Sequence, residues 1–315
     1  MKLKDLIAQY GAFKKAMGEH FDSAESVLKT FCRQMEPDIE LEDISADRVA
    51  AFLAGTGPVT RYWHRKHGVL RGLYHYAISR GWVTESPLPT VVPKLPTRFV
   101  PYVYTHDELG RLVRATTSYR QHPRKLEPHT LRAILLLLYG AGLRVSEAVA
   151  LTLEEVDLPN SLLTVRNTKF NKTRLVPLGS DLQEVMTQYL TRRQQAGHAQ
   201  PPGAPFFVLR RGTPVSVQIV EHNFRQLCEY AGVRRTDGAR YQPRLHDLRH
   251  SFAVHRLTSW YQQGADVQAL LPSLSTYLGH VNLAATQVYL TMTPQLLQEA
   301  SRRFEHYAFE EMPHD

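Results

Sequence analysis

The sequence predicts a mainly helical protein with a small antiparallel β-sheet, an α+β fold divided between two domains. The chain has 315 residues, which is more than one hydrophobic core usually covers. Apolar residues recur at helical spacing over most of its length, and a few short segments of the second half have strand composition. A proline-rich tract separates the two halves.

The first domain is predicted over residues 1–90. Up to about Trp82, apolar side chains recur every three or four residues, as in Leu6, Tyr10 and Phe13. This spacing gives each helix one apolar face, and the faces of several helices together form a core. We therefore expect a small, all-helical domain.

A linker is predicted over residues 91–103, at the end of a tract rich in proline. The prolines of this tract are Pro87, Pro89, Pro93, Pro96 and Pro101. Proline removes a backbone donor and breaks helices, so the segment should be extended. The second domain then covers residues 104–315.

The second domain should begin with a helix. Residues 105–108 place a threonine before two acidic residues, a pattern typical of a helix start. Residues 129–139 are apolar nearly all round, which predicts a central helix. Two glycines end that helix before Arg144 begins another turn.

Short β-type runs follow at residues 162–166 and 174–178. The residues between them predict a hairpin with Lys169 near its turn. Residues 206–209 are expected to add a third strand. Most of the remainder is predicted to be helical, including residues 219–231, 246–257 and 296–308.

The charge balance favours a polyanionic partner. The chain has 38 Lys and Arg against 30 Asp and Glu, a formal net charge of +8. A positive excess attracts nucleic acid over long range and gains from counterion release.

Other features indicate a cytoplasmic protein. Cys32 and Cys228 match no metal-binding spacing, which favours two thiols in a reducing compartment. The N-terminus lacks the pattern of a secretion signal. The longest apolar run, residues 133–139, is far shorter than the roughly 20 residues of a membrane span, so no membrane partner is expected.

An ordered set of cationic, imidazole and phenol side chains is the most specific feature of the second domain. Its members are Arg144, Lys169, His246, Arg249, His280 and Tyr289. Guanidinium groups stay charged and form forked hydrogen bonds to phosphate oxygens, which lysine cannot copy. A tyrosine after such a set is a candidate nucleophile for a phosphodiester.

In order and spacing these residues, with segments 138–147, 246–249 and 278–280 around them, resemble the tyrosine recombinases, also called the phage integrase family. The resemblance covers the whole second domain, which would be the catalytic domain. The helical first domain and its linker are similar to that family's core-binding domain. The resemblance implies two lobes that form a C-shaped clamp around double-stranded DNA, with no metal ion and no organic cofactor.

The resemblance also implies a role for each residue. Tyr289 would attack the scissile phosphate to give a 3′-phosphotyrosine and a free 5′-hydroxyl. The two arginines, Arg144 and Arg249, would bind the non-bridging oxygens, and two histidines, His246 and His280, would add hydrogen bonds. Lys169 would protonate the leaving oxygen. Glu147, one helical turn beyond Arg144, would hold that arginine.

Alternatives remain for several of these residues. Lys172 lies in the same turn as Lys169, and both could contact DNA phosphates; the resemblance favours Lys169 as the catalytic lysine. Tyr277 competes with Tyr289 and could instead lie in the core. His246 and His250 are four residues apart, like the zinc ligands of some metalloproteases, but no third ligand is evident.

Residues 60–74 interleave cations and aromatic residues on a predicted helix. We expect DNA contacts from four of these cations, since arginine and lysine bind backbone phosphates; they are Arg61, Arg65, Lys66 and Arg71. The alternative is a solvated helix face opposite an aromatic stripe in the core.

The C-terminal segment, residues 294–308, has an apolar stripe at helical spacing. In similar recombinases the last helix docks on a neighbouring protomer, which implies a homotetramer on DNA; packing onto its own domain is the alternative. The longer segments 118–128, 259–264 and 271–273 suggest a mobile-element recombinase acting in integration, excision or transposition.

Two other functions use the same fold. One is relaxation of DNA by a type IB topoisomerase, which uses the same chemistry without site preference. The other is a DNA-binding regulator without catalysis.

Overall fold

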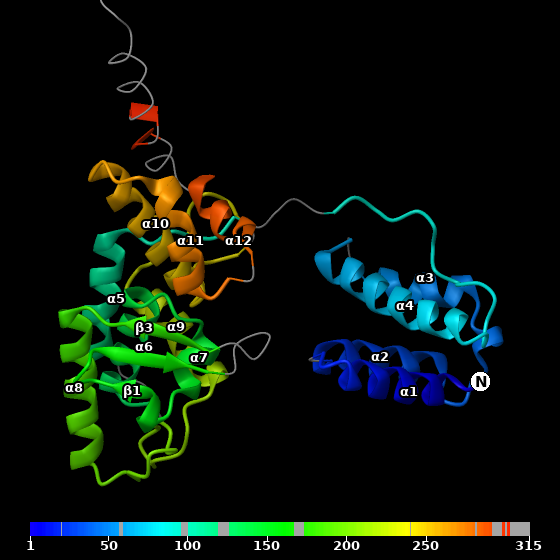
Figure 1. Cartoon of the computed structure of the whole chain (residues 1–315), viewed down its shortest axis with the longest axis horizontal. Coiled ribbons are helices and arrows are strands. Elements are labelled where there is room, and N and C mark those ends of the chain that lie inside the picture. Colours follow the sequence, from blue (N-terminus) through cyan, green and yellow to red (C-terminus); the bar gives the residue numbers. More distant parts are fainter. Residues whose placement is uncertain are drawn as a thin grey trace, which may run out of the picture. The chain divides into compact units, whose positions relative to one another are not determined.

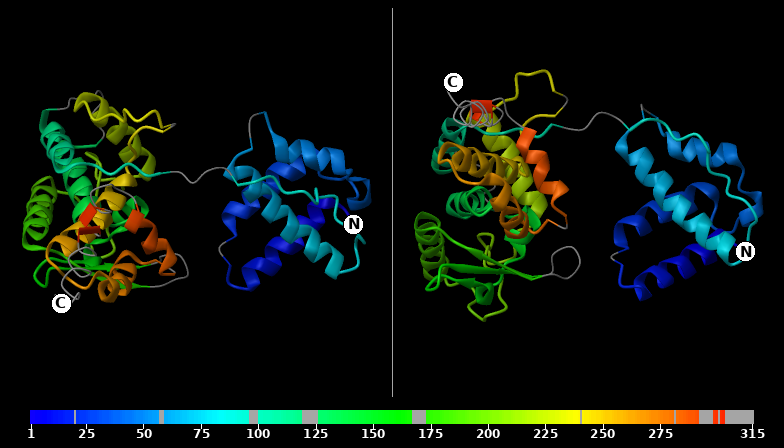
Figure 2. Two further views of the ribbon diagram at one scale, coloured as in Figure 1. Left: turned by 90° about the horizontal axis from the view of Figure 1, so that it is seen from above. Right: turned by 45° about the horizontal axis from the view of Figure 1, so that its top comes forward.

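The computed structural model of the chain describes residues 1–19, 21–56, 59–95, 100–118, 126–166, 173–239, 241–280, 282–291, 298–299 and 301–302. The chain divides into two compact units, Met1–Phe99 and Val100–Asp315. Figures 1 and 2 trace their helices and strands. The described residues are mostly helical with a small antiparallel sheet, so the predicted fold class is confirmed.

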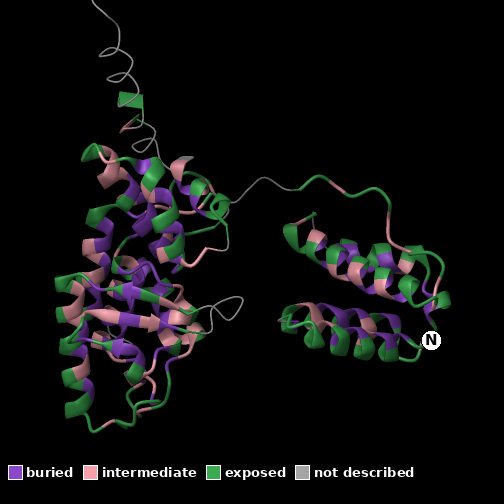
Figure 3. Cartoon of the chain, in the orientation of Figure 1, coloured by how far each residue is buried: buried purple, intermediate pink, exposed green. Residues whose placement is uncertain are grey.

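The first unit is helical wherever the structure describes regular elements. These elements are α1 (Leu3–Ala16), α2 (Asp22–Met35), η1 (Leu41–Asp43), α3 (Ala46–Ala54) and α4 (Arg61–Ser79). Hydroxyl side chains mark two helix starts, because Ser45 accepts a hydrogen bond from the Arg48 N–H and Thr60 accepts one from the Tyr62 N–H. Apolar faces of all four helices enclose one core, which appears as the buried inner faces in Figure 3.

The second unit contains the remaining helices. They are α5 (His106–Ser118), α6 (Pro128–Gly140), α7 (Val145–Ala150), η2 (Leu153–Glu155), α8 (Ser180–Gln195), α9 (Val217–Tyr230), α10 (Asp247–Gln262), α11 (Val267–Leu278), α12 (Ala284–Gln287) and η3 (Val288–Thr291). The predicted start of α5 is confirmed, since Thr105 and Glu108 exchange side-chain and backbone hydrogen bonds.

Helix α6 is the centre of the second unit. It packs against α5, α7, α8 and α10, and its residues Ile134 and Leu137 have no exposed surface. Each apolar face of α6 therefore packs against another helix, and the predicted central position of this helix is confirmed. None of the described helices is long and apolar enough to cross a bilayer.

The sheet consists of β1 (Val156–Asp157), β2 (Leu162–Val165) and β3 (Arg174–Pro177), in that order and antiparallel. Strands β2 and β3 are the two predicted hairpin strands, with Leu163 opposite Val176 and both side chains fully buried. The turn that joins them, including Lys169 and Lys172, lies outside the described residues.

The prediction of a strand at residues 206–209 is wrong. These residues join no ladder and take part only in an isolated bridge between Val208 and Pro214. Loop backbone and side chains of α8 satisfy their backbone instead. The Phe206 N–H donates to the Leu151 carbonyl and the Leu209 N–H to the Thr213 carbonyl, while the Tyr189 hydroxyl donates to the Phe206 carbonyl and accepts from the Val208 N–H. The apolar run therefore fills the core without a neighbouring strand.

Helices α10 and α11 form a smaller core with Tyr289 of η3. In Figure 1 these elements lie together, with α12 beside α11. Helix α11 ends at Leu278 and is capped by Gly279, whose backbone is left-handed (φ 66°, ψ 44°), a conformation that glycine adopts without strain. The chain reverses there and continues into His280.

Candidate active site

Arg249 lies on α10 and has only 2% of its surface exposed. Its Nη1 atom donates to the Gly142 carbonyl at 2.6 Å, and its Nη2 atom donates to the Leu278 carbonyl. Burial, and next the charge of Arg144, lowers the pKa of Arg249 to about 10. The guanidinium therefore stays charged at neutral pH, at a point where three segments of the chain meet.

Gly142 brings its carbonyl to Arg249 because it is a glycine. Its φ of +60° lies in the left-handed region. A Cβ atom at this position would lie 2.6 Å from Cδ1 of Phe252 on α10. A side chain would thus be strained by the backbone and would collide with the helix that carries Arg249.

Arg144 is the residue immediately before α7. The Glu147 carboxylate accepts from the Arg144 backbone N–H at 2.9 Å and from its Nη1 atom at 2.6 Å. The Nη2 atom of Arg144 donates to the Gly279 carbonyl at 3.1 Å. The structure thus brings Arg144 together with Glu147 and with the segment that precedes His280.

Arg174, the first residue of β3, joins the same cluster. Its Nη1 and Nη2 atoms donate to the two Glu147 oxygens at 3.1 and 2.8 Å. Burial alone would raise the pKa of Glu147, but hydrogen bonds from Arg174 and from the Arg144 backbone, with the charges of both arginines, hold it at about 2. The carboxylate is therefore ionised between two cations.

The sequence reasoning did not single out Arg174. A signal was present, because Arg174 stands two residues before Val176 and so has the parity of the core-facing side of β3. An arginine at such a position needs a buried partner.

His280 follows the turn at Gly279 and faces Tyr289. Its Nδ1 atom lies 2.7 Å from the Oγ1 atom of Thr286 on α12. Its ring stacks on the Tyr289 ring with centroids 5.9 Å apart. Burial, and next the charges of Arg249 and Arg144, lowers the pKa of His280 to about 4. The imidazole is therefore neutral at physiological pH.

His246 immediately precedes α10, and its ring meets the ring of His250 edge-on, with centroids 4.8 Å apart. The pKa of His246 is lowered to about 4, because surrounding protein atoms desolvate the ring and His250 and Arg249 lie nearby, although the residue keeps surface open to solvent. The ring of His250 also packs against the ring of Tyr289, with centroids 5.5 Å apart. In the described part of the chain, no three His, Cys, Asp or Glu side chains are grouped so that they could hold a metal ion.

Tyr289 of η3 is buried, with 3% of its surface exposed. Burial raises the pKa of its phenol, while the charge of Arg249 and a side-chain hydrogen bond with it act in the opposite direction. The alternative nucleophile, Tyr277, lies elsewhere: its hydroxyl donates to the Pro177 carbonyl at 3.5 Å and its ring stacks on Phe252. The phenol beside the arginine is that of Tyr289.

Five of the predicted catalytic residues therefore gather from separate segments, and the sixth, Lys169, lies outside the described residues. The five are Arg144, His246, Arg249, His280 and Tyr289. Two guanidinium groups and neutral imidazoles next to a phenol suit a tetrahedral anion whose phosphorus the phenol oxygen attacks.

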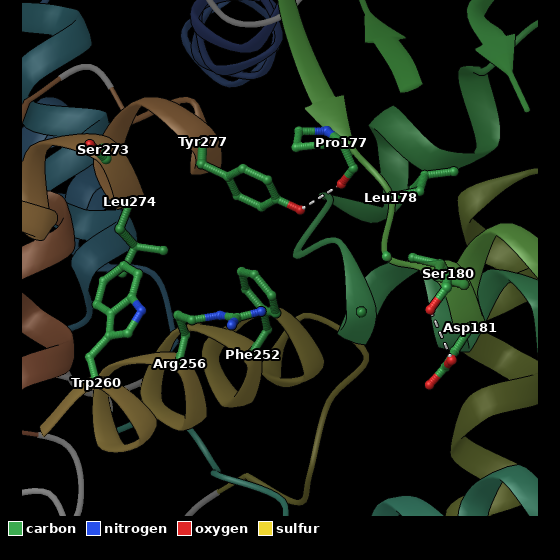
Figure 4. A pocket seen from close by; sticks show the side chains of 13 residues that line it. Pro177, Leu178, Ser180, Asp181, Phe252, Arg256, Trp260, Ser273, Leu274 and Tyr277 are labelled. Atoms are coloured by element: carbon green, nitrogen blue, oxygen red, sulfur yellow. Dashed lines mark hydrogen bonds between the residues drawn. The ribbon is translucent and has the colours of Figure 1, made fainter. Parts of the chain in front are cut away.

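A separate apolar pocket of about 610 Å³ lies beside this cluster, between the end of β3, α10 and α11. Tyr277 points across it toward Pro177, with Trp260 and Arg256 on the opposite wall (Figure 4). None of the predicted catalytic residues lines it. The candidate anion site is therefore the neighbouring cluster of five predicted catalytic side chains, and not this pocket.

In the first unit, the predicted DNA-contacting cations of α4 do not share one face. Arg61, Arg65 and Arg71 are exposed. Lys66 is buried, with 8% of its surface exposed, and its Nζ atom donates to the Phe52 carbonyl. One residue beyond Arg65, the helix has turned by about 100° toward the core. This placement argues against a DNA contact by Lys66.

Residues 103–295 match the phage integrase family. A putative integrase/recombinase of Sinorhizobium fredii, y4rE, is 35% identical over 303 residues, 96% of this chain and 95% of that protein. A second one from the same organism, y4rB, is 38% identical over 246 residues, 78% of each chain.

Solved structures share the fold. The integrase of transposon Tn1549, in complex with transposon right end DNA, superposes with a TM-score of 0.68 at 16% identity, over 98% of this chain and 100% of that chain. A λ integrase tetramer bound to a Holliday junction gives a TM-score of 0.64 at 20% identity, over 90% of this chain and 78% of that chain.

Proposed function

Because the chain belongs to the phage integrase family, we propose that Tyr289 is the nucleophile with which it cleaves DNA. Members of this family are tyrosine recombinases, so the chain is a site-specific DNA recombinase, an enzyme that cleaves and rejoins DNA strands. The observation that carries the proposal is the position of the Tyr289 ring, which stacks on the His280 ring with centroids 5.9 Å apart, close enough to the buried Arg249 for that charge to act on the phenol.

In the proposed reaction, the phenol of Tyr289 gives up its proton to solvent as its oxygen attacks the scissile phosphorus. The bond from phosphorus to the 5′-oxygen breaks, which leaves a 3′-phosphotyrosine and a 5′-hydroxyl. Because the phosphotyrosine keeps a phosphodiester bond, attack by another 5′-hydroxyl rejoins the strands without an external energy source. Lys169 would protonate the departing oxygen, a role that rests on the family resemblance alone.

The two arginines and two histidines would bind the non-bridging oxygens of the phosphate. Arg249 is held by two carbonyls and Arg144 by Glu147, so neither has to reorganise as negative charge develops in the transition state. His246 and His280 have pKa values of about 4, which supports hydrogen-bond donation from neutral rings rather than charge attraction in the free enzyme.

The proposed partner of both units is double-stranded DNA. The exposed arginines of α4 would bind backbone phosphates of the duplex, together with Lys172 of the β2–β3 turn. Assembly as a homotetramer would follow the λ integrase tetramer, which is bound to a Holliday junction. The predicted C-terminal interaction helix falls mostly outside the described residues.

We further propose that the recombinase acts on a mobile element. The Tn1549 integrase is bound to a transposon end, and its fold extends over nearly all of this chain. Integration, excision and transposition all use the same cleavage and rejoining steps.

A suicide substrate tests the nucleophile. A duplex carrying the recombination site is nicked next to the cleavage position, so that the short 5′-hydroxyl fragment diffuses away and the covalent complex accumulates. We expect the wild-type chain and Tyr277→Phe to form this complex and Tyr289→Phe to form none, although all three bind the DNA. Covalent complex formation by Tyr289→Phe would exclude the assignment.

A further inference from the structure

Arg174 is a partly buried arginine whose three side-chain nitrogens all have protein partners. Two of them bind the Glu147 carboxylate, and Nε donates to the Tyr277 carbonyl at 3.0 Å. Only 9% of the side chain is exposed. Because all three nitrogens are already bonded within the protein, we expect Arg174 to act on the reaction through these partners.

The first partner, Glu147, is shared between two cations. Its Oε1 atom accepts from Arg144 at 2.6 Å and from Arg174 at 3.1 Å. One carboxylate between two guanidinium groups leaves a net charge of +1. Without Arg174, the same carboxylate would neutralise Arg144 alone and weaken its attraction for an anion.

The second partner is the end of α11. Arg174 binds the Tyr277 carbonyl, and a Cβ atom on Gly279 would lie only 2.8 Å from Nη1 of Arg174. The Gly279 carbonyl in turn accepts a hydrogen bond from Arg144. The same guanidinium therefore supports both Arg144 and the turn that leads into His280.

From these contacts, and resting on the function proposed above, we propose that Arg174 is a positioning residue for strand cleavage. It fixes Glu147, and through Glu147 it fixes the guanidinium of Arg144 at the phosphate. It also offsets the charge of Glu147, so that Arg144 remains a net attractor of the phosphate rather than half of a neutral pair.

Single-turnover cleavage of the suicide substrate at saturating enzyme measures this role. We expect Arg174→Gln to slow cleavage by about a hundredfold while the Kd for DNA changes by less than about threefold. Arg174→Lys keeps the positive charge but lacks the forked guanidinium, so it should cleave about tenfold faster than Arg174→Gln. Arg210→Gln, which removes an exposed ion pair with Glu127 outside the cluster, is the matched control and should cleave at the wild-type rate.

The double variant Arg174→Gln/Glu147→Gln separates charge offset from a merely structural role. If Arg174 offsets the carboxylate, removing that negative charge should make the double variant at least tenfold faster than Arg174→Gln. A substrate with a neutral methylphosphonate at the scissile position should likewise shrink the defect of Arg174→Gln. Equal defects on both substrates with no recovery in the double variant would overturn the proposal, as would wild-type cleavage by Arg174→Gln.

Binding of inorganic phosphate tests the role of Arg174 without requiring cleavage. Inorganic phosphate should raise the Tm of the wild-type chain by binding at Arg144, raise that of Arg174→Gln much less, and regain its effect in the double variant. This pattern supports the role of Arg174 even if Tyr289 forms no covalent complex. Equal phosphate shifts in the wild type and Arg174→Gln contradict it, even if the covalent complex forms.

Discussion

The Oγ1 atom of Thr286 lies 2.7 Å from the Nδ1 atom of His280, and Thr286 is fully buried. A hydroxyl that donates to Nδ1 places the proton of the neutral imidazole on Nε2. Nε2 then carries the donor that a phosphate oxygen needs. The threonine stands three residues before Tyr289, so one short segment carries both the proposed nucleophile and the group that orients the histidine beside it.

Replacing Thr286 with valine should therefore impair cleavage without loss of binding. Valine nearly keeps the volume of threonine but cannot donate to His280, so the tautomer and the ring orientation are no longer set. We expect single-turnover cleavage to slow by about ten- to a hundredfold, equivalent to about 1.4 to 2.7 kcal/mol. Thr286→Ser keeps the hydroxyl and should stay within about threefold of the wild type. A wild-type rate for Thr286→Val would mean that the hydroxyl does not orient His280.

Gly142→Ala should destabilise the second unit as well as the site. The substitution adds a Cβ atom to a backbone with φ of +60° and places it 2.6 Å from the Phe252 ring. Backbone strain alone costs about 1 to 3 kcal/mol, and the collision adds to it. Urea denaturation measures the loss. Gly179→Ala is the control, because Gly179 has a φ of −70° and no atom within 4 Å of an added Cβ atom; equal stability of the two variants would refute the steric argument.

Much of this architecture follows from local patterns in the sequence. Helix α6 could be predicted because its apolar residues leave no polar face, which requires partners all round. Strands β2 and β3 could be predicted from two short runs on either side of a polar turn. Strand β1 could not, because its two residues are too few to form a pattern.

The site could be predicted less completely, because its geometry is set by contacts between distant segments. Glu147 was identified since it is one helical turn from Arg144. Arg174 was not, because its partner Glu147 is 27 residues away and only the fold brings them together. Lys66 was predicted to contact DNA because lysine binds phosphates, but its position on α4 buries it in the core.

Arg249→Lys should slow cleavage strongly and lower stability. Lysine has no fork that can serve the carbonyls of Gly142 and Leu278 at once, so one buried acceptor loses its partner. We expect at least a hundredfold slower cleavage and a lower Tm. Arg256→Lys is a matched control on the exposed side of the same helix. Near wild-type cleavage by Arg249→Lys would contradict a bidentate role for Arg249.

The exposed arginines of α4 should control the salt dependence of DNA binding. Arg61→Gln, Arg65→Gln and Arg71→Gln should each reduce the slope of log K against log salt concentration by about one, because each removes one phosphate contact. Lys66→Gln should instead lower the Tm and leave the slope unchanged, since its ammonium is bound to the Phe52 carbonyl. Fluorescence anisotropy over a salt series measures the slopes. A smaller slope for Lys66→Gln alone would reverse our placement of the DNA-binding face.

Acidification should destabilise the second unit by protonating histidines of the unfolded chain. Burial is the first cause that lowers the pKa values of the partly buried His250, His255 and His280 to about 4, below the usual 6.5. Between these values the unfolded chain binds protons that the folded chain does not, so stability falls as pH falls from about 6.5 to about 4. At pH 5, unfolding should take up about three protons from the partly buried His250, His255 and His280, since the exposed His246 is screened by solvent, and His255→Gln should reduce this by about one.

Bound DNA should weaken the dependence of stability on pH. This effect is expected because two of the titrating histidines lie at the proposed anion site. A bound phosphate favours the charged imidazolium of His246 and His280, which raises their pKa values in the complex. His255 bonds to the Tyr139 hydroxyl and stacks on His106, away from that cluster. Its contribution to the loss of stability on acidification should therefore be the same with and without DNA. Tm measured against pH, with and without DNA, should therefore show a smaller loss on acidification for the complex. A Tm that is independent of pH from 6.5 to 4, or equal slopes in both states, would contradict a phosphate site lined by neutral histidines.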